Sequence, residues 1–119
     1  MISILPLKDT GLLEKLNRES GCGAKLAYCL YDKDRLAGWI LYRLEGRSGF
    51  IEMVSAPDNS SFDGLVRAVY GSLLDFGIDQ ASFSAKVDPD ILIKFGFMDQ
   101  NGVSRKISDV ICCCKDCEL

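Results

Sequence analysis

The stretch from Ser55 to Gly77, SAPDNSSFDGLVRAVYGSLLDFG, contains main-chain groups that could bind an anion. Its pattern predicts the end of a strand, a loop and an amphipathic helix, and the first amides of a helix attract phosphate. The loop offers one glycine, Gly64, beside an acidic residue, Asp63. The connection is therefore either a phosphate cradle or an ordinary capped helix start, with Ser60 and Asp63 as a capping box and Val66 facing the core.

The cysteine-rich segment ICCCKDC is the second group that could do chemistry. Zinc sites use four soft ligands, usually as two closely spaced pairs, and here only Cys114 and Cys117 form a CxxC pair. On a strand, Cys112 and Cys114 would share one face and Cys113 the other, which suits no single metal cage. We therefore expect no metal site and apolar packing of these cysteines. Redox or disulfide use and metal binding are the alternatives.

Histidine is absent from the chain, so the commonest general base and the commonest zinc ligand are missing. Any acid–base chemistry must use Asp, Glu, Tyr, Cys or water. The net charge is −3 and the basic residues are scattered, whereas a nucleic-acid binder usually carries a basic stripe. We therefore expect no nucleic-acid partner.

The 119 residues suit one domain, residues 1–119, with 48% hydrophobic residues to form its core. No apolar run approaches the length that spans a membrane, and MISILPL lacks the positive flank of a signal peptide. These observations predict a cytoplasmic protein with no membrane partner.

The elements that would position these groups follow from apolar periodicity and turn residues. They predict an α/β (α+β) fold in which helices flank a mixed sheet, in the order β-α-β-β-β-α-β-α-β-β. Strands are expected at residues 2–7, 24–34, 35–46, 48–57, 81–85, 104–108 and 109–114, and helices at 10–20, 62–76 and 88–96. The helix between strands 48–57 and 81–85 makes them parallel neighbours joined by a right-handed crossover.

The order of these elements, with several local motifs, resembles the GNAT acetyltransferase superfamily over nearly the whole chain. DRLAGWILYRLEGRSGFIEMVSAPD is similar to that family's antiparallel hairpin, and GLVRAVYGSLLDFG resembles the helix that follows its pyrophosphate loop. ILIKFGF resembles the segment that precedes its last two strands and ends in Gly-Phe, here Gly96 and Phe97.

The resemblance implies an acyl-CoA site in a gap between the fourth and fifth strands. The thioester carbonyl and the pantetheine arm are expected on backbone groups of Val54, Ser55 and Ala56. The pyrophosphate is expected on the loop at the positive end of the helix. The residues of this loop are Ser61, Phe62, Asp63, Gly64 and Leu65.

The resemblance also assigns a general base. An acidic residue on the family's fourth strand often deprotonates the amine, directly or through water, and Glu52 occupies the matching position. The alternation Phe50-Glu52-Val54 leaves an alternative, in which Glu52 lies on a solvated sheet face with no catalytic role.

Four departures from the family pattern weaken the assignment of an acyl-CoA site and of catalysis. Ser61 stands where the family has Gln or Arg, and Val66 stands where it has a second small residue. Asp63 and the nearby Asp58 put negative charge where a diphosphate would lie. Leu92 replaces the tyrosine that usually protonates the leaving thiolate, so water or another residue would have to do so.

The sequence thus predicts an N-acyltransferase that moves an acetyl or other acyl group from a CoA thioester, acetyl-CoA in the simplest case. The acceptor is a small-molecule or protein amine, and a homodimer stays open. The alternative is a degenerate, non-catalytic GNAT-like domain that binds a ligand or a protein. A thiol or metal sensor built on the C-terminal cysteines is a third, more distant alternative.

Overall fold

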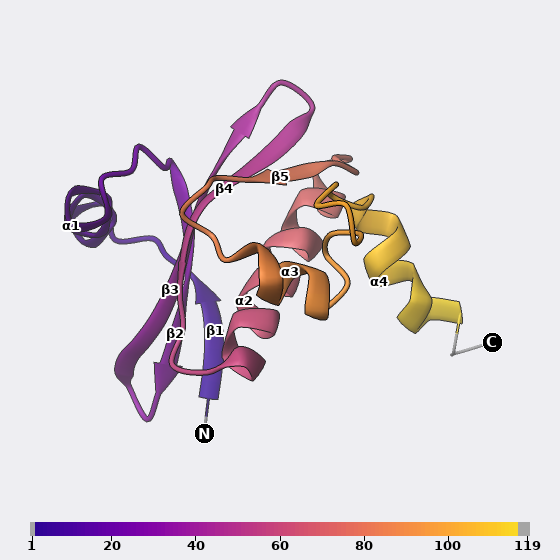
Figure 1. Cartoon of the computed structure of the whole chain (residues 1–119). Coiled ribbons are helices and arrows are strands. Elements are labelled where there is room, and N and C mark those ends of the chain that lie inside the picture. The colour runs from indigo at the N-terminus through magenta and orange to yellow at the C-terminus, as the bar shows by residue number, and fades with distance from the viewer. Residues whose placement is uncertain (1, 117–119) are drawn as a thin grey trace.

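The computed structural model describes the backbone of residues 2–116 and the side chains of residues 2–111. Five strands form one sheet in the order β1-β2-β3-β4-β5 (Figure 1). β1 to β4 are antiparallel neighbours, and β4 pairs with β5 in parallel, so the predicted mixed sheet is confirmed. The strands are β1 (Ile2–Pro6), β2 (Leu26–Asp32), β3 (Arg35–Glu45), β4 (Ser48–Ser55) and β5 (Ala81–Phe83).

The β2–β3 hairpin turns at Lys33 and Asp34, as predicted. Both residues have positive φ angles, 52° and 70°. Such angles belong to the tight turns whose twist matches that of the flanking strands. The next connection, from β3 to β4, turns at Gly46, which also has a positive φ.

Two of the helices agree closely with the predicted ranges. α1 (Thr10–Ser20) is capped by Asp9, whose side chain accepts hydrogen bonds from the amides of Gly11 and Leu12, and it ends at Gly21 in the left-handed conformation. α3 (Pro89–Lys94) begins after the N-cap Asp88, with proline in its first turn.

The helix α2 (Asn59–Asp75) forms the crossover between β4 and β5, which confirms the predicted parallel pairing. It begins earlier than the sequence pattern suggested. Asp58 is the N-cap, and its carboxylate accepts the amide hydrogen of Ser61 at 2.7 Å. The predicted capping box of Ser60 and Asp63 is therefore wrong, because the cap comes from two residues before Ser60.

The predicted closing pair of strands at 104–108 and 109–114 is wrong. Ser104 makes only an isolated bridge with Met98, and residues 107–116 form the helix α4 (Ile107–Asp116). A distant residue starts this helix, because Asp79 accepts hydrogen bonds from the amides of Ile107 and Ser108.

Helices cover the two faces of the sheet unequally (Figure 1). α2, α3 and α4 lie on one face, and α1 alone lies on the other. Residues from α2, including Leu65, Val69 and Leu73, anchor the larger core cluster, whereas the smaller cluster gathers around Leu16 of α1. None of the described helices is long and apolar enough to cross a membrane.

Candidate functional site

The parallel strands β4 and β5 separate partway along β4. They pair from Gly49 with Ala81 to Ile51 with Phe83, and the last ladder bond runs from the Ser84 amide to the Ile51 carbonyl at 2.9 Å. The chain then turns away, while β4 continues to Ser55. Among the described residues, no strand pairs with the outer edge of residues 53–55, so this edge of β4 is open.

A β-bulge lies where the strands separate. Tyr42 of β3 pairs with Ile51 and Leu41 pairs with Met53, so Glu52 is the extra residue on β4. A bulge bends its strand and re-aims a side chain, which is why such features are common beside active sites. Here the bulge directs Glu52 toward the face that carries α1, where Gly23 lies just beyond the end of that helix.

The Glu52 carboxylate is buried, since the residue is 7% exposed. The alternative of a solvated Glu52 is therefore wrong. One carboxylate oxygen, Oε1, accepts the amide hydrogen of Gly23 at 3.3 Å and lies 3.5 Å from Nη1 of Arg43. The other, Oε2, is buried and has no hydrogen-bond partner among the described residues. Burying a carboxylate oxygen without a hydrogen-bond donor lowers the stability of the fold, unless another group supplies a proton or a positive charge to that oxygen.

The residues predicted to hold the thioester arm lie at the open end of β4. Val54 and Ala56 are half-buried and pack against the larger core cluster, and Ser55 is half-buried between them. The Ser55 carbonyl lies so close to Gly38 that a Cβ there would be 2.7 Å from this oxygen. Gly38 therefore permits the tight approach of β3 to the end of β4.

The residues predicted as the pyrophosphate loop belong to the first two turns of α2 rather than to a loop. The Ser61 amide donates to the Asp58 carboxylate, and the Phe62 amide donates to the Asp58 carbonyl at 3.0 Å. The amides of Asp63, Gly64 and Leu65 lie inside the helix, where each is used by the carbonyl four residues earlier. Within this segment, the amides of Asn59 and Ser60 come before the first of these bonds and have no partner inside the helix.

Side chains of the same segment serve the fold. Phe62, Leu65 and Val66 are buried in the larger cluster, so Val66 faces the core and does not fill the gap. A Cβ on Gly64 would lie 3.0 Å from Cδ1 of Ile4, so this glycine lets α2 approach β1 closely.

Two acidic residues, Asp58 and Asp63, lie near the start of α2. Hydrogen bonds from Ser61 hold the pKa of Asp58 below its usual value, so this carboxylate is ionised over the physiological range. Asp63 forms an ion pair with Arg67, one turn further along, at 2.9 Å.

No phenol replaces the missing tyrosine at the surface of the gap, as far as the described side chains show. Leu92 is fully buried in the larger cluster. Tyr70 is fully buried, and burial raises its pKa well above the usual value. Burial likewise raises the pKa of Tyr42. Both residues are therefore poor proton donors to a thiolate.

Lys86, which sequence reasoning missed, joins two regions beside Glu52. Its Nζ donates to the carbonyls of Ser20 at 2.7 Å and Gly21 at 3.0 Å, and it lies 3.8 Å from Sγ of Cys22. A cation at the C-terminal end of a helix is favourable because the last carbonyls carry partial negative charge. More than sixty residues separate these partners, so no local sequence signal could reveal the contact.

Two cysteines have described side chains, and both are free thiols: Cys22 is half-buried and Cys29 is buried. The backbone of Cys112, Cys113 and Cys114 is helical, so the strand geometry assumed for them is wrong. Their side chains and Cys117 lie outside the described part of the chain. Within that part, no three Cys, Asp or Glu residues gather closely enough to hold a metal ion.

No family model matches the chain, and no curated protein sequence is significantly similar to it. Solved structures do resemble it. A GNAT-family acetyltransferase from Streptococcus pneumoniae superposes with a TM-score of 0.55 at 16% identity, covering 82% of this chain and 83% of that one. An aminoglycoside acetyltransferase from an uncultured soil metagenomic sample, solved with trehalose, gives 0.55 at 9% identity, covering 80% and 84%.

A predicted acetyltransferase from Clostridium acetobutylicum, solved with acetyl-CoA, gives a TM-score of 0.52 at 14% identity and covers 85% of this chain and 92% of that chain. At these identities the likeness is one of fold. The protein has the fold of the GNAT acetyltransferases, with a helix in place of the expected closing strands.

Proposed function

We propose that the protein is an acyl-CoA-dependent N-acyltransferase that moves an acetyl group from acetyl-CoA to an amine of a small molecule or a protein. The observation that carries this proposal is the open edge of β4 beside a buried carboxylate. Residues 53–55 offer unpaired main-chain groups, and the adjacent Glu52 has an oxygen that lacks a donor.

In this reaction the amine nitrogen attacks the thioester carbonyl carbon, and the carbon–sulfur bond breaks. Glu52 takes the proton that the amine loses, through Oε2, directly or by way of a water. A buried carboxylate also attracts a protonated amine before the reaction. Because Leu92 and Tyr70 cannot donate, water supplies the proton to the CoA thiolate.

The main chain of Val54, Ser55 and Ala56 would hold the thioester arm, because β-strand edges bind extended ligands through alternating donors and acceptors. The diphosphate would lie at the start of α2. Since the amides of residues 61–65 are used within the helix or by Asp58, we assign this contact to the amides of Asn59 and Ser60.

Asp58 supports a second candidate, the non-catalytic GNAT-like domain. Its carboxylate already occupies the anion-binding start of α2 and would repel a diphosphate there. On this hypothesis the protein keeps the fold and has lost the cofactor, and it binds another ligand or a protein partner.

Thermal denaturation with CoA and with acetyl-CoA separates the two candidates. Ligand at a hundredfold excess over its dissociation constant adds about 2.7 kcal/mol to the free energy of unfolding, which is readily measured. A shift supports the enzyme. If millimolar CoA causes none in the wild type but stabilises Asp58→Ala, the carboxylate blocks the site and the second candidate is correct. No shift in either protein overturns the acyl-CoA assignment.

The variant Glu52→Gln tests the general base. We expect acyl transfer to fall about 10²- to 10⁴-fold while the CoA-induced shift is kept. Glu45→Gln is the matched control, because Glu45 is exposed and also pairs with Arg43, at 3.3 Å. Equal activity in the two variants would remove Glu52 from the mechanism.

A further inference from the structure

β1 is an outer strand of the sheet, and within the described residues it pairs only with β2. The Leu7 amide donates to Ala27 at 2.9 Å, so the main-chain groups of Leu7 point toward β2. These groups alternate along a strand, so those of Ser3 and Leu5 also point toward β2. The main-chain groups of Ile2, Ile4 and Pro6 therefore point outward, without a partner strand.

This edge lacks the features that usually keep outer strands apart. Residues 2–6 contain no charged side chain, and their register with β2 has no bulge. Ile2 is 58% exposed and Leu5 is 53% exposed, so two large apolar side chains flank the free edge. Pro6 at the end of the strand is its only interruption, because proline has no amide hydrogen to donate.

We propose that a second copy of this chain pairs with β1 in antiparallel orientation, about a two-fold axis at Ile4. In this register Ile4 exchanges two hydrogen bonds with Ile4 of the second copy. Each Ile2 amide donates to the Pro6 carbonyl of the other copy. Pro6 has no amide hydrogen with which to return this bond, so one hydrogen bond is missing at each end of the ladder and none at its centre. An interface of this kind is self-complementary, as two-fold symmetry requires.

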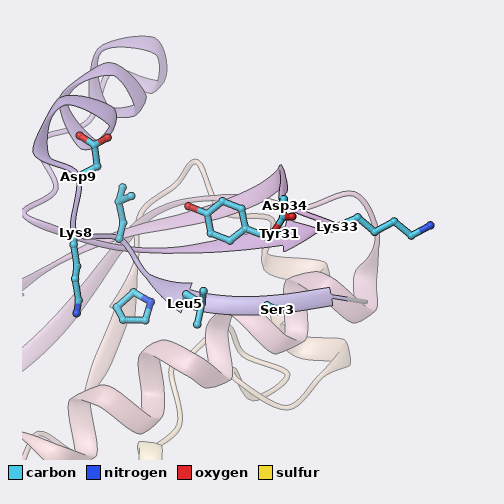
Figure 2. A pocket seen from close by; sticks show the side chains of 9 residues that line it. Ser3, Leu5, Lys8, Asp9, Tyr31, Lys33 and Asp34 are labelled. Carbon is cyan, nitrogen blue, oxygen red and sulfur yellow. The ribbon is translucent and has the colours of Figure 1, made fainter.

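The side chains fit the same register. Leu5 lies opposite Ser3 of the second copy, so a large side chain meets a small one at each of the two equivalent positions. These are the closely spaced pairs of an antiparallel ladder, in which side chains contact most directly. An open cavity of about 540 Å³ lies beside Leu5, with Tyr31 across from it, on the face that carries α1 (Figure 2).

Charge complementarity supports a second copy as the occupant. Figure 2 shows Lys8 and Asp9 at one end of β1, and Lys33 and Asp34 at the other. Antiparallel pairing brings the Lys33–Asp34 turn of one copy beside Lys8 and Asp9 of the other. Each turn carries one positive and one negative side chain and meets a lysine and an aspartate of the other copy, so each charge has an opposite charge within the facing pair, twice per dimer. The inference does not depend on the proposed acyl transfer, because β1 and β4 lie in different parts of the sheet.

Sedimentation equilibrium over a range of concentrations tests the dimer. The wild type should reach twice the chain mass of 13.1 kDa. Leu5→Lys should weaken dimerisation at least tenfold, because it replaces the apolar contact with a charge. Leu44→Lys is the matched control, since Leu44 is 43% exposed on β3 and lies outside the proposed interface. Equal dimerisation of the two variants, or a monomeric wild type at millimolar concentration, overturns the proposal.

Amide hydrogen exchange of the wild type tests the register without any substitution. The amides of Ile2 and Ile4 should become protected as concentration rises, whereas those of Ser3 and Leu5 should be protected even in the dilute monomer. A dimer whose Ile4 amide exchanges equally fast at all concentrations uses another surface, and the proposal is then wrong.

Discussion

The two faces of the sheet differ in how they are packed and in what they bury. The face covered by α2, α3 and α4 carries a large continuous cluster that runs from Leu30 to Val110. The smaller cluster, on the face covered by α1, has four buried residues: Leu16, Ala24, Ala27 and Leu41. The buried carboxylate of Glu52 lies on this second face. The stability of the fold therefore depends mainly on the face that α2 covers, and the other face can accommodate a charged group.

The comparison would break if leucines on the two faces contributed equally to stability. Leu73→Ala should lower the free energy of unfolding by about 3–5 kcal/mol, because the rigid surroundings leave a cavity. Leu16→Ala should cost less, about 2 kcal/mol, because a single short helix can settle onto the small residues beneath it. Urea denaturation measures both values, and a larger loss for Leu16→Ala would contradict the comparison.

On the face covered by α1, a hydrogen-bonding side chain replaces part of the apolar packing. The Asn17 side chain bonds to both the amide and the carbonyl of Ala24, at 2.9 and 2.8 Å, and so holds the segment after α1. Asn17→Ala should cost about 1–3 kcal/mol, since both main-chain groups lose their partner. Asn101→Ala, at an exposed turn, is the control and should leave the denaturation midpoint unchanged.

On the face covered by α2, the N-cap of this helix makes the stability of the fold depend on pH. Because the pKa of Asp58 is lowered in the folded state, its carboxylate stabilises the fold above the unfolded pKa and loses this effect as pH falls through the folded pKa. Asp58→Ala should therefore melt at a lower temperature than wild type at neutral pH, with the difference shrinking in acid. Asp58→Asn, which can still cap, should show little such dependence. A difference that does not change with pH would exclude the charge as its cause.

Thiol reactivity gives the smallest expected effect, in a comparison of Cys29 within the sheet and Cys22 in the segment between α1 and β2. Burial raises the pKa of the Cys29 thiol, whereas Cys22 is half-buried near Lys86. Iodoacetamide at neutral pH should label Cys22 before Cys29, because the thiolate is the reactive form and access is needed. Peptide mass spectrometry measures the order in which the two thiols are labelled, and this order should disappear when urea unfolds the protein. Faster labelling of Cys29 would show that the sheet opens there.

The sequence pattern predicted most of the layout correctly because its signals are local. The positive φ of Lys33 and Asp34 and the caps at Asp9 and Asp88 are encoded within a few residues. The last helix was missed because Val110 to Cys114 form a short apolar run, whose periodicity does not distinguish strand from helix. In the structure, the carbonyl and the carboxylate of Asp79 accept hydrogen bonds at the start of this helix, and Asp79 is distant in sequence.

The candidate site could be predicted only in part. The order of the elements predicted that β4 and β5 are parallel neighbours, whereas the gap between them and the acidic residue on β4 were expected from the family resemblance. The burial of Glu52 depends on the bulge and on Gly23, and both arise from long-range pairing. For the same reason the sequence did not reveal that Gly64 serves the contact between α2 and β1.

The contacts of Lys86 have a mechanical consequence. Its ammonium group donates hydrogen bonds to the last carbonyls of α1 and so links this helix to the segment that follows β5. Movement of the end of α1 away from this segment would have to break both hydrogen bonds. A substitution that neutralises Lys86 would remove both hydrogen bonds at once and leave the end of α1 held by its other contacts alone.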